Sequence, residues 1–139
     1  MSLSIVIPAK NEGGAIGTVV SIAQETYPDA EIIVVDDGSD DNTAAVAADA
    51  GAKVISHPES LGNGAAVKTG ARAAAGEIIA FMDGDGQHTA AELAPLLEQL
   101  NNGYDMAIGA RDTGSHASVG RWCANGLYNA IASMMSGRK

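Results

Sequence analysis

The sequence predicts a single α/β domain, a three-layer sandwich in which helices cover a mostly parallel β-sheet. Two observations predict this fold class. Short apolar runs alternate with stretches of helical spacing along the chain. The run Glu31-Ile32-Ile33-Val34-Val35 is apolar at every position after the first, which is typical of a strand buried on both faces. At 139 residues, 46% of them hydrophobic, the chain is long enough for one core, and we treat residues 1–139 as one domain.

The first half of the chain is predicted to contain three strands and two helices. Leu3 to Pro8 is a strand that Pro8 ends, and a helix follows from Ala15 to about Gln24. After the buried strand 31–35, residues 40–43 offer N-caps for a helix that reaches Ala50, with Gly51 as its C-cap. Residues 53–56 form a short third strand.

The second half continues the alternation. The predicted elements are a helix over 65–75, a strand over 77–82, a helix from Thr89 to Leu100, a strand over 105–109 and a helix over 119–135. Thr89 and Glu92 have capping-box spacing. Pro95 fits this region better if the helix begins a residue or two later, because proline is tolerated in a first turn.

Polar and charged residues follow several of the predicted strands. They are Pro8 to Glu12, the pair Asp36-Asp37, the triplet Asp83-Gly84-Asp85, and Arg111. In a parallel sheet the carboxyl ends of the strands share one edge, and ligands bind at that edge. The sequence therefore predicts that these four loops form one site.

The acidic turn after the strand 77–82 suggests a divalent metal. Asp83 and Asp85 stand one residue apart, glycines flank them, and Gln87 adds a neutral oxygen. Hard oxygen ligands suit Mg²⁺ or Mn²⁺, which keep several waters and share phosphate oxygens with a substrate. For an Asp-Gly-Asp triplet alone, a solvated acidic turn is the competing interpretation.

Other side chains have more than one interpretation. Asp36 and Asp37 can accept hydrogen bonds from a ribose hydroxyl or a base N–H, while Asp40 to Asn42 cap the next helix. Arg111 can add a fork of donors to a leaving phosphate. His88 is either a metal or phosphate contact or a local hydrogen-bonding partner. For the two other histidines and for Cys123, structural roles are favoured, and Lys68 and Arg72 are expected to form a solvated helix face rather than a phosphate site.

The charge distribution limits the partners. The net charge of −9 argues against nucleic acid. Residues 1–110 carry sixteen acids and four Lys or Arg, whereas residues 111–139 carry one acid and four bases, which suggests an anionic partner or membrane surface for that basic segment. A single cysteine, no basic leader and no membrane-length apolar run lead us to expect a cytoplasmic protein, peripheral at most to the membrane. A homo-oligomer stays open.

Five motifs together resemble a known family. They are Ile5 to Glu12, Val34 to Thr43, Leu61-Gly62-Asn63-Gly64, Met82 to His88 and Gly109-Ala110-Arg111. In order and spacing they resemble the inverting GT-A glycosyltransferases, and most closely the dolichyl- or polyprenyl-phosphate mannose and glucose synthases. The resemblance covers nearly the whole chain and implies the Rossmann-like GT-A α/β/α sandwich.

The resemblance also implies roles for individual residues. Pro8, Lys10 and Glu12 would line the nucleotide base, and Asp36 and Asp37 would hold base and ribose. Asp83, Gly84 and Asp85, the DXD motif, would lie against the sugar nucleotide, and Asp83, Asp85 and Gln87 would hold Mg²⁺ or Mn²⁺. Asp85 and Arg111 would be catalytic, with Arg111 on the leaving diphosphate and Arg121 on the acceptor phosphate. The synthases often carry an aromatic residue where this chain has Lys10, so UDP and GDP both stay open.

The implied function is transfer of a hexose from a nucleotide-diphosphate sugar to a polyprenyl or dolichyl phosphate, with inversion. A phosphate acceptor is already ionised, so no strong general base is required. Members of the family continue well past residue 139, so we expect the donor-binding half with the acceptor half largely missing.

Three alternatives remain. One is a truncated domain that binds a nucleotide sugar without turnover. A sugar nucleotidyltransferase would need a Gly-rich basic loop after the first strand, where only Lys10 is basic. A phospho-acceptor signalling module would need an Asp after the third strand and a Lys after the fifth, where Ser56-His57 and Ala110-Arg111 stand.

Overall fold

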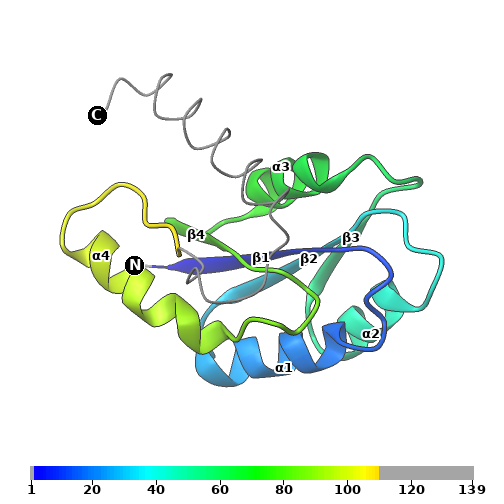
Figure 1. Ribbon diagram of the computed structural model, residues 1–139, viewed down its shortest axis with the longest axis horizontal. Coiled ribbons are helices and arrows are strands. Elements are labelled where there is room, and N and C mark those ends of the chain that lie inside the picture. Colours follow the sequence, from blue (N-terminus) through cyan, green and yellow to red (C-terminus); the bar gives the residue numbers. More distant parts are fainter. Residues whose placement is uncertain (1, 110–139) are drawn as a thin grey trace, which may run out of the picture. The chain divides into compact units, whose positions relative to one another are not determined.

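The computed structural model describes residues 2–109, a parallel α/β arrangement (Figure 1). The elements in chain order are β1 (Leu3–Ala9), α1 (Ile16–Thr26), β2 (Glu31–Asp36), α2 (Thr43–Asp49), β3 (Lys53–Ser56), α3 (Asn63–Ala73), β4 (Ile78–Phe81), the short 3₁₀ helix η1 (Ala90–Leu93) and α4 (Ala94–Asn101). The predicted fold class is confirmed. Pro95 lies in the first turn of the fourth helix, as expected, but α4 begins only at Ala94, later than the one or two residues expected, because the Thr89–Glu92 capping box starts η1 instead.

The four strands form one sheet in the order β3-β2-β1-β4, and each neighbouring pair is parallel. β1 is central: Ala9 stands opposite Asp36 of β2, and Val6 stands opposite Phe81 of β4. The carboxyl ends of the strands consequently share one edge, and the loops after β1, β2, β3 and β4 all leave from it.

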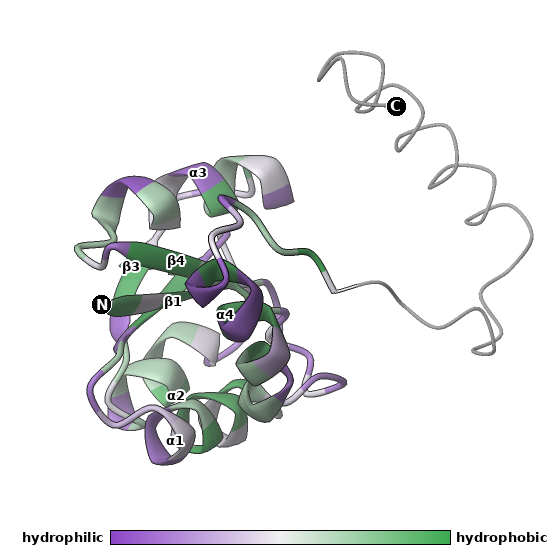
Figure 2. Ribbon diagram, turned by 90° about the vertical axis from the view of Figure 1, so that its left-hand side faces the viewer, coloured by the Kyte–Doolittle hydropathy of each residue, from purple (hydrophilic) through white to green (hydrophobic). Residues whose placement is uncertain are grey.

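Helices cover the two faces of the sheet unequally. α1, α2 and α4 lie on one face, and α3 lies on the other (Figures 1 and 2). Alternation along the strands divides the apolar side chains between these layers. Ile5, Ile7, Ile32 and Val34 pack with α1, whereas Val6, Ile33 and Val35 pack with Ala66 of α3.

Pro8 does not end β1, contrary to the prediction. The strand continues to Ala9, and Pro8 pairs with Val35 in register. The carbonyl of Val6 accepts the Met82 N–H on the β4 side of β1, whereas the carbonyl of Ala9 accepts the Asp37 N–H on the β2 side. Because the backbone groups of successive residues in a strand point to opposite sides, the backbone of Pro8 faces β4, as that of Val6 does. Because β4 ends at Phe81, opposite Val6, the proline removes no ladder hydrogen bond.

The predicted strand over 105–109 is also wrong, because these residues form no strand in the described part of the chain. Met106 and Ile108 of this short apolar run are 74% and 77% exposed, as they would not be in a buried strand. The predicted helix over 119–135, Arg111 and Arg121 lie outside the described residues. None of the helices in residues 2–109 is long and apolar enough to span a bilayer.

Candidate functional site

The loop after β1 is held by the loop after β2. The N–H of Asn11 donates to Ser39 Oγ at 2.9 Å, and Asn11 Oδ1 accepts the Asp40 N–H at 2.8 Å. Asn11 has a φ of 54°, a left-handed conformation that asparagine tolerates better than most residues. The two loops therefore form one hydrogen-bonded rim.

Thr43 and Asp41 extend this rim to the start of α1. The N–H of Glu12 donates to the hydroxyl of buried Thr43 at 2.9 Å, and the N–H of Gly13 donates to Asp41 Oδ2 at 3.0 Å. Asp41 also accepts from the Thr43 hydroxyl, and this bond is the main cause that lowers the Asp41 pKa. The half-buried Glu12 leads into α1, because its carbonyl accepts the N–H groups of the N-cap Ala15 and of Ile16, the first residue of the helix.

Asp36 is the last residue of β2 and is 5% exposed. Its Oδ1 accepts the Ser39 N–H at 3.2 Å, and its carbonyl accepts the His57 N–H at 2.8 Å. Alternation gives Asp36 the same face as Val34, which packs in the α1 layer. Asp36 therefore lies at the carboxyl edge, on the α1 side and opposite Ala9.

Asp37 is 4% exposed, and its carboxylate makes four hydrogen bonds. Oδ1 accepts from His57 Nδ1 at 2.7 Å and from the Leu61 N–H at 2.9 Å. Oδ2 accepts from Ser60 Oγ at 2.8 Å and from the Gly62 N–H at 2.9 Å. The bond from His57, followed by that from the Leu61 N–H, holds the pKa of Asp37 well below its usual range. These bonds occupy the acceptor positions that the sequence prediction reserved for a base or ribose.

The acidic turn owes its shape to Gly84. This residue is buried, and a Cβ added to it would lie 3.3 Å from Ala9 Cβ, Ile16 Cδ1 and Ile7 Cγ2. Because the turn packs its glycine against the core, the residues on either side face outward: Asp83 is exposed and Asp85 is half-buried. Gly84 itself can offer a ligand only its backbone.

The segment after the turn is also fixed. The N–H of Gln87 donates to Asp85 Oδ1 at 2.9 Å. His88 Nδ1 lies 2.9 Å from Glu92 Oε2, and this partner lowers the pKa of Glu92. His88 therefore has the local hydrogen-bonding role, one of the two roles left open by the sequence.

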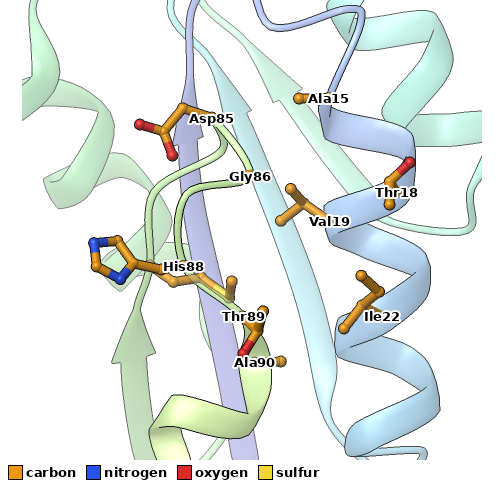
Figure 3. A pocket seen from close by; sticks show the side chains of 10 residues that line it. Ala15, Thr18, Val19, Ile22, Asp85, Gly86, His88, Thr89 and Ala90 are labelled. Carbon is orange, nitrogen blue, oxygen red and sulfur yellow. The ribbon is translucent and has the colours of Figure 1, made fainter.

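A pocket of about 320 Å³ lies between α1 and the acidic turn (Figure 3). Val19 and Ile22 of α1, with Ala15 at its N-cap, line one side, and Gly86 and Ala90 line the other. In Figure 3 the carboxylate of Asp85 and the imidazole of His88 point away from α1. Both residues also belong to the lining of this mainly apolar pocket.

The described residues offer a divalent ion an incomplete set of ligands. Within residues 2–109 no three His, Cys, Asp or Glu side chains converge on a point. Two outward carboxylates on one turn nevertheless fit Mg²⁺ or Mn²⁺, which are bound by one or two carboxylates together with waters and substrate phosphates. A binding mode in which the substrate completes the coordination is compatible with this geometry.

The structure brings most predicted site residues to one edge. Ala9 lies between the acidic turn and Asp36, since it contacts the Gly84 position and pairs with Asp36. Half-buried Pro8 and exposed Lys10 flank it. The partners of Asn11, Thr43 and His57 could not be named from the sequence, although a structural role was expected for His57 and a cap position for Thr43.

Comparison with known proteins identifies the family. The model of glycosyl transferase family 2 matches residues 4–133, nearly the whole chain. The chain belongs to this family. A dolichol-phosphate mannosyltransferase of Pyrococcus furiosus is 34% identical over 117 residues, which cover 80% of this chain and 33% of that protein. A dodecaprenyl-phosphate galacturonate synthase of Rhizobium johnstonii is 30% identical over 146 residues, covering 94% of this chain and 43% of the relative.

A solved structure shares the fold. The glucosyl-3-phosphoglycerate synthase of Mycobacterium tuberculosis, in complex with Mn²⁺, UDP-glucose and phosphoglyceric acid, is 28% identical with a TM-score of 0.63. The match covers 73% of this chain and 40% of that one. The expected GT-A fold is thereby confirmed, and the chain spans less than half the length of these relatives.

Proposed function

We propose that this chain is the donor-binding part of a metal-dependent, inverting glycosyltransferase that moves a hexose from a nucleotide-diphosphate sugar to a polyprenyl or dolichyl phosphate. The observation that carries the proposal is the edge itself: buried Gly84 turns Asp83 and Asp85 outward beside Ala9, and Asp36 lies on the other side of Ala9. Family membership supports the sugar donor, and the two polyprenyl- and dolichol-phosphate relatives support the acceptor.

Different residues at this edge would contact different parts of the donor. Asp36 would accept a hydrogen bond from the base or ribose, and Pro8, Lys10 and Glu12 would line the base. Asp83 and Asp85, with Gln87, would hold Mg²⁺ or Mn²⁺. When bound, the ion would supply the positive charge that offsets the diphosphate.

The reaction would be one displacement. An oxygen of the acceptor phosphate attacks the anomeric carbon, the bond to the diphosphate breaks, and its electron pair leaves with the nucleoside diphosphate. Arg111 would contact this leaving group and Arg121 the acceptor phosphate. Both arginines belong to the basic segment 111–139, which we propose faces the anionic acceptor and the cytoplasmic membrane surface.

Calorimetric titration of the chain with UDP-, GDP- and dTDP-sugars, with and without Mn²⁺, tests the proposal. We expect one nucleotide to bind only with Mn²⁺, and Asp85→Ala to weaken binding at least about tenfold, or 1.4 kcal/mol. Asp29→Ala makes the same charge change at an exposed position in the turn before β2 and should bind normally. If a folded chain binds none of these sugars, the donor site is disproved.

A second candidate function is donor binding without turnover. The chain spans 33% of the mannosyltransferase and 43% of the galacturonate synthase, which leaves more than half of each relative without a counterpart. Transfer of labelled sugar to a polyprenyl phosphate, assayed with the nucleotide sugar that binds, separates the two functions. Labelled lipid supports the transferase, whereas binding without labelled lipid supports the binding domain.

A further inference from the structure

Asp37 differs from its neighbour Asp36 in what surrounds it. Its two carboxylate oxygens offer about four acceptor positions, and four donors within 2.9 Å fill them. Alternation also puts Asp37 on the same face as Val35, which packs in the α3 layer, away from the acidic turn on the α1 side. A donor bound between Asp36 and the acidic turn would thus lie on the α1 side of the sheet, whereas Asp37 points to the α3 side.

The four donors come from one loop. His57 lies directly after β3, and residues 60–62 lead into α3. The imidazole is 9% exposed, and its Nε2 lies 2.9 Å from Thr69 Oγ1 in the middle of α3. One buried carboxylate therefore connects the end of β2 to both ends of the 57–62 loop and, through His57, to the helix that follows.

The same loop packs directly against the residue after Asp37. Gly38 has a φ of 65°, and a Cβ there would lie 2.6 Å from the Glu59 carbonyl carbon and 2.7 Å from the Ser60 nitrogen. The His57 N–H also donates to the Asp36 carbonyl. The loop is consequently a wall beside Asp36, and Leu61, at 55% exposed, is the large apolar side chain that it leaves open to solvent.

We infer that Asp37 and His57 are positioning residues, which hold the 57–62 loop as one wall of the donor site while Asp37 itself makes no contact with the donor. The effect on donor binding rests on the proposed function. The four hydrogen bonds that the 57–62 loop donates to Asp37, which we call the clamp, exist without a donor. Asp36 is then the carboxylate of the pair that meets the nucleotide, and Leu61 is the apolar surface that the clamp presents to it.

Amide hydrogen exchange in the donor-free chain tests the clamp. In Asp37→Asn one carboxylate oxygen becomes an NH₂ group, so a backbone N–H loses its acceptor. We expect exchange of the Leu61 or Gly62 amide to accelerate at least about tenfold, because the 57–62 loop can then open by itself while the rest of the domain stays folded. Asp36→Asn keeps the oxygen that accepts from Ser39 and should leave both amides slow. Unchanged exchange in Asp37→Asn overturns the clamp.

Donor titration with Mn²⁺ then tests the positioning role. Ser60→Ala removes one partner of the carboxylate and leaves Asp37 in place. We expect Asp37→Asn to weaken binding about tenfold and Ser60→Ala about threefold, with the double variant close to Asp37→Asn alone because both act through one loop. His57→Asn, which can still donate to Asp37, should bind better than His57→Ala.

The possible outcomes are distinct. If Asp37→Asn loses affinity while the exchange of Leu61 and Gly62 stays slow and Ser60→Ala binds normally, Asp37 contacts the donor and the inference fails. If the wild-type chain binds no nucleotide, the proposed function fails by itself, and the exchange measurement still decides whether the clamp exists.

Discussion

Replacing Gly70 with alanine sets helix propensity against packing. Gly70 lies in α3, where glycine costs about 1 kcal/mol relative to alanine, so propensity alone predicts a more stable protein. A Cβ at this position, however, would lie 2.2 Å from Val6 Cγ1 and 3.2 Å from Val35 Cγ2. Carbon atoms in contact normally lie about 3.5–4.0 Å apart, so the helix or the central strand would have to move by more than about 1 Å.

The packing cost should win. Overpacking a well-filled core costs about 1–3 kcal/mol, and the overlap with Val6, which is fully buried, points to the upper end of this range. After subtraction of the propensity gain, we expect Gly70→Ala to lower the free energy of unfolding by about 2 kcal/mol, measured by urea denaturation. The melting temperature should fall by about 5–10 °C.

The same helix provides a matched control. A Cβ at Gly64, in the first turn of α3, would meet no atom within 4 Å, so Gly64→Ala should be neutral or stabilise by up to about 1 kcal/mol. Val6→Ala removes the methyl group that Gly70→Ala would strike, so the double variant should lose less than the sum of the two single losses. If Gly70→Ala is as stable as Gly64→Ala, the close packing of α3 on β1 is refuted.

Two further predictions concern electrostatics and backbone conformation. Hydrogen bonds from the Ala75 N–H, the Ser4 hydroxyl and Lys53 lower the pKa of Glu31 to about 2, below the ordinary 4.5. The ionised Glu31 carboxylate therefore stabilises the fold fully above pH 4.5, and this stabilisation is lost as the pH falls toward 2. The melting temperature of Glu31→Gln should depend less on pH in that window than the melting temperature of the wild-type chain, and an equal pH dependence of the two contradicts this. Asn11→Ala combines left-handed strain with loss of the bond to Asp40 and should cost about 2 kcal/mol in urea unfolding, whereas Asn11→Gly loses the bond alone and should cost about half as much. Equal losses would show that strain at Asn11 is absent.

The local elements were predictable because their signals are local. The apolar run of β2, the β3 range 53–56 and the Gly51 cap, with its φ of 96°, all follow from short-range pattern and turn chemistry. The errors concern pairing. Pro8 is compatible with a central strand only because β4 is short, and a short apolar run such as 105–109 forms a strand only if another strand pairs with it. Neither fact is visible in the segment itself.

The candidate site was predictable at the level of loops, since parallel topology brings them to one edge, but individual roles depended on contacts distant in sequence. His57, twenty residues after Asp37, was expected to have a structural role, but its partner, the Asp37 carboxylate, could not be named from the sequence. Likewise Thr43 was one of the N-cap candidates for α2, but in the structure Asn42 is the N-cap, and the Thr43 hydroxyl instead accepts the Glu12 N–H from another loop.

The Asp36-Asp37 pair shows how one elementary rule separates residues that look equivalent. Successive residues of a strand point to opposite faces, so two adjacent carboxylates at a strand end cannot both face one ligand unless the strand twists sharply. Here Asp36 shares the face of the acidic turn, and Asp37 shares the face of α3, where the loop before that helix fills its acceptor positions. An acidic pair after a buried strand therefore predicts one ligand-facing acid and one that builds the wall beside it, and the face on which the next helix packs decides which is which.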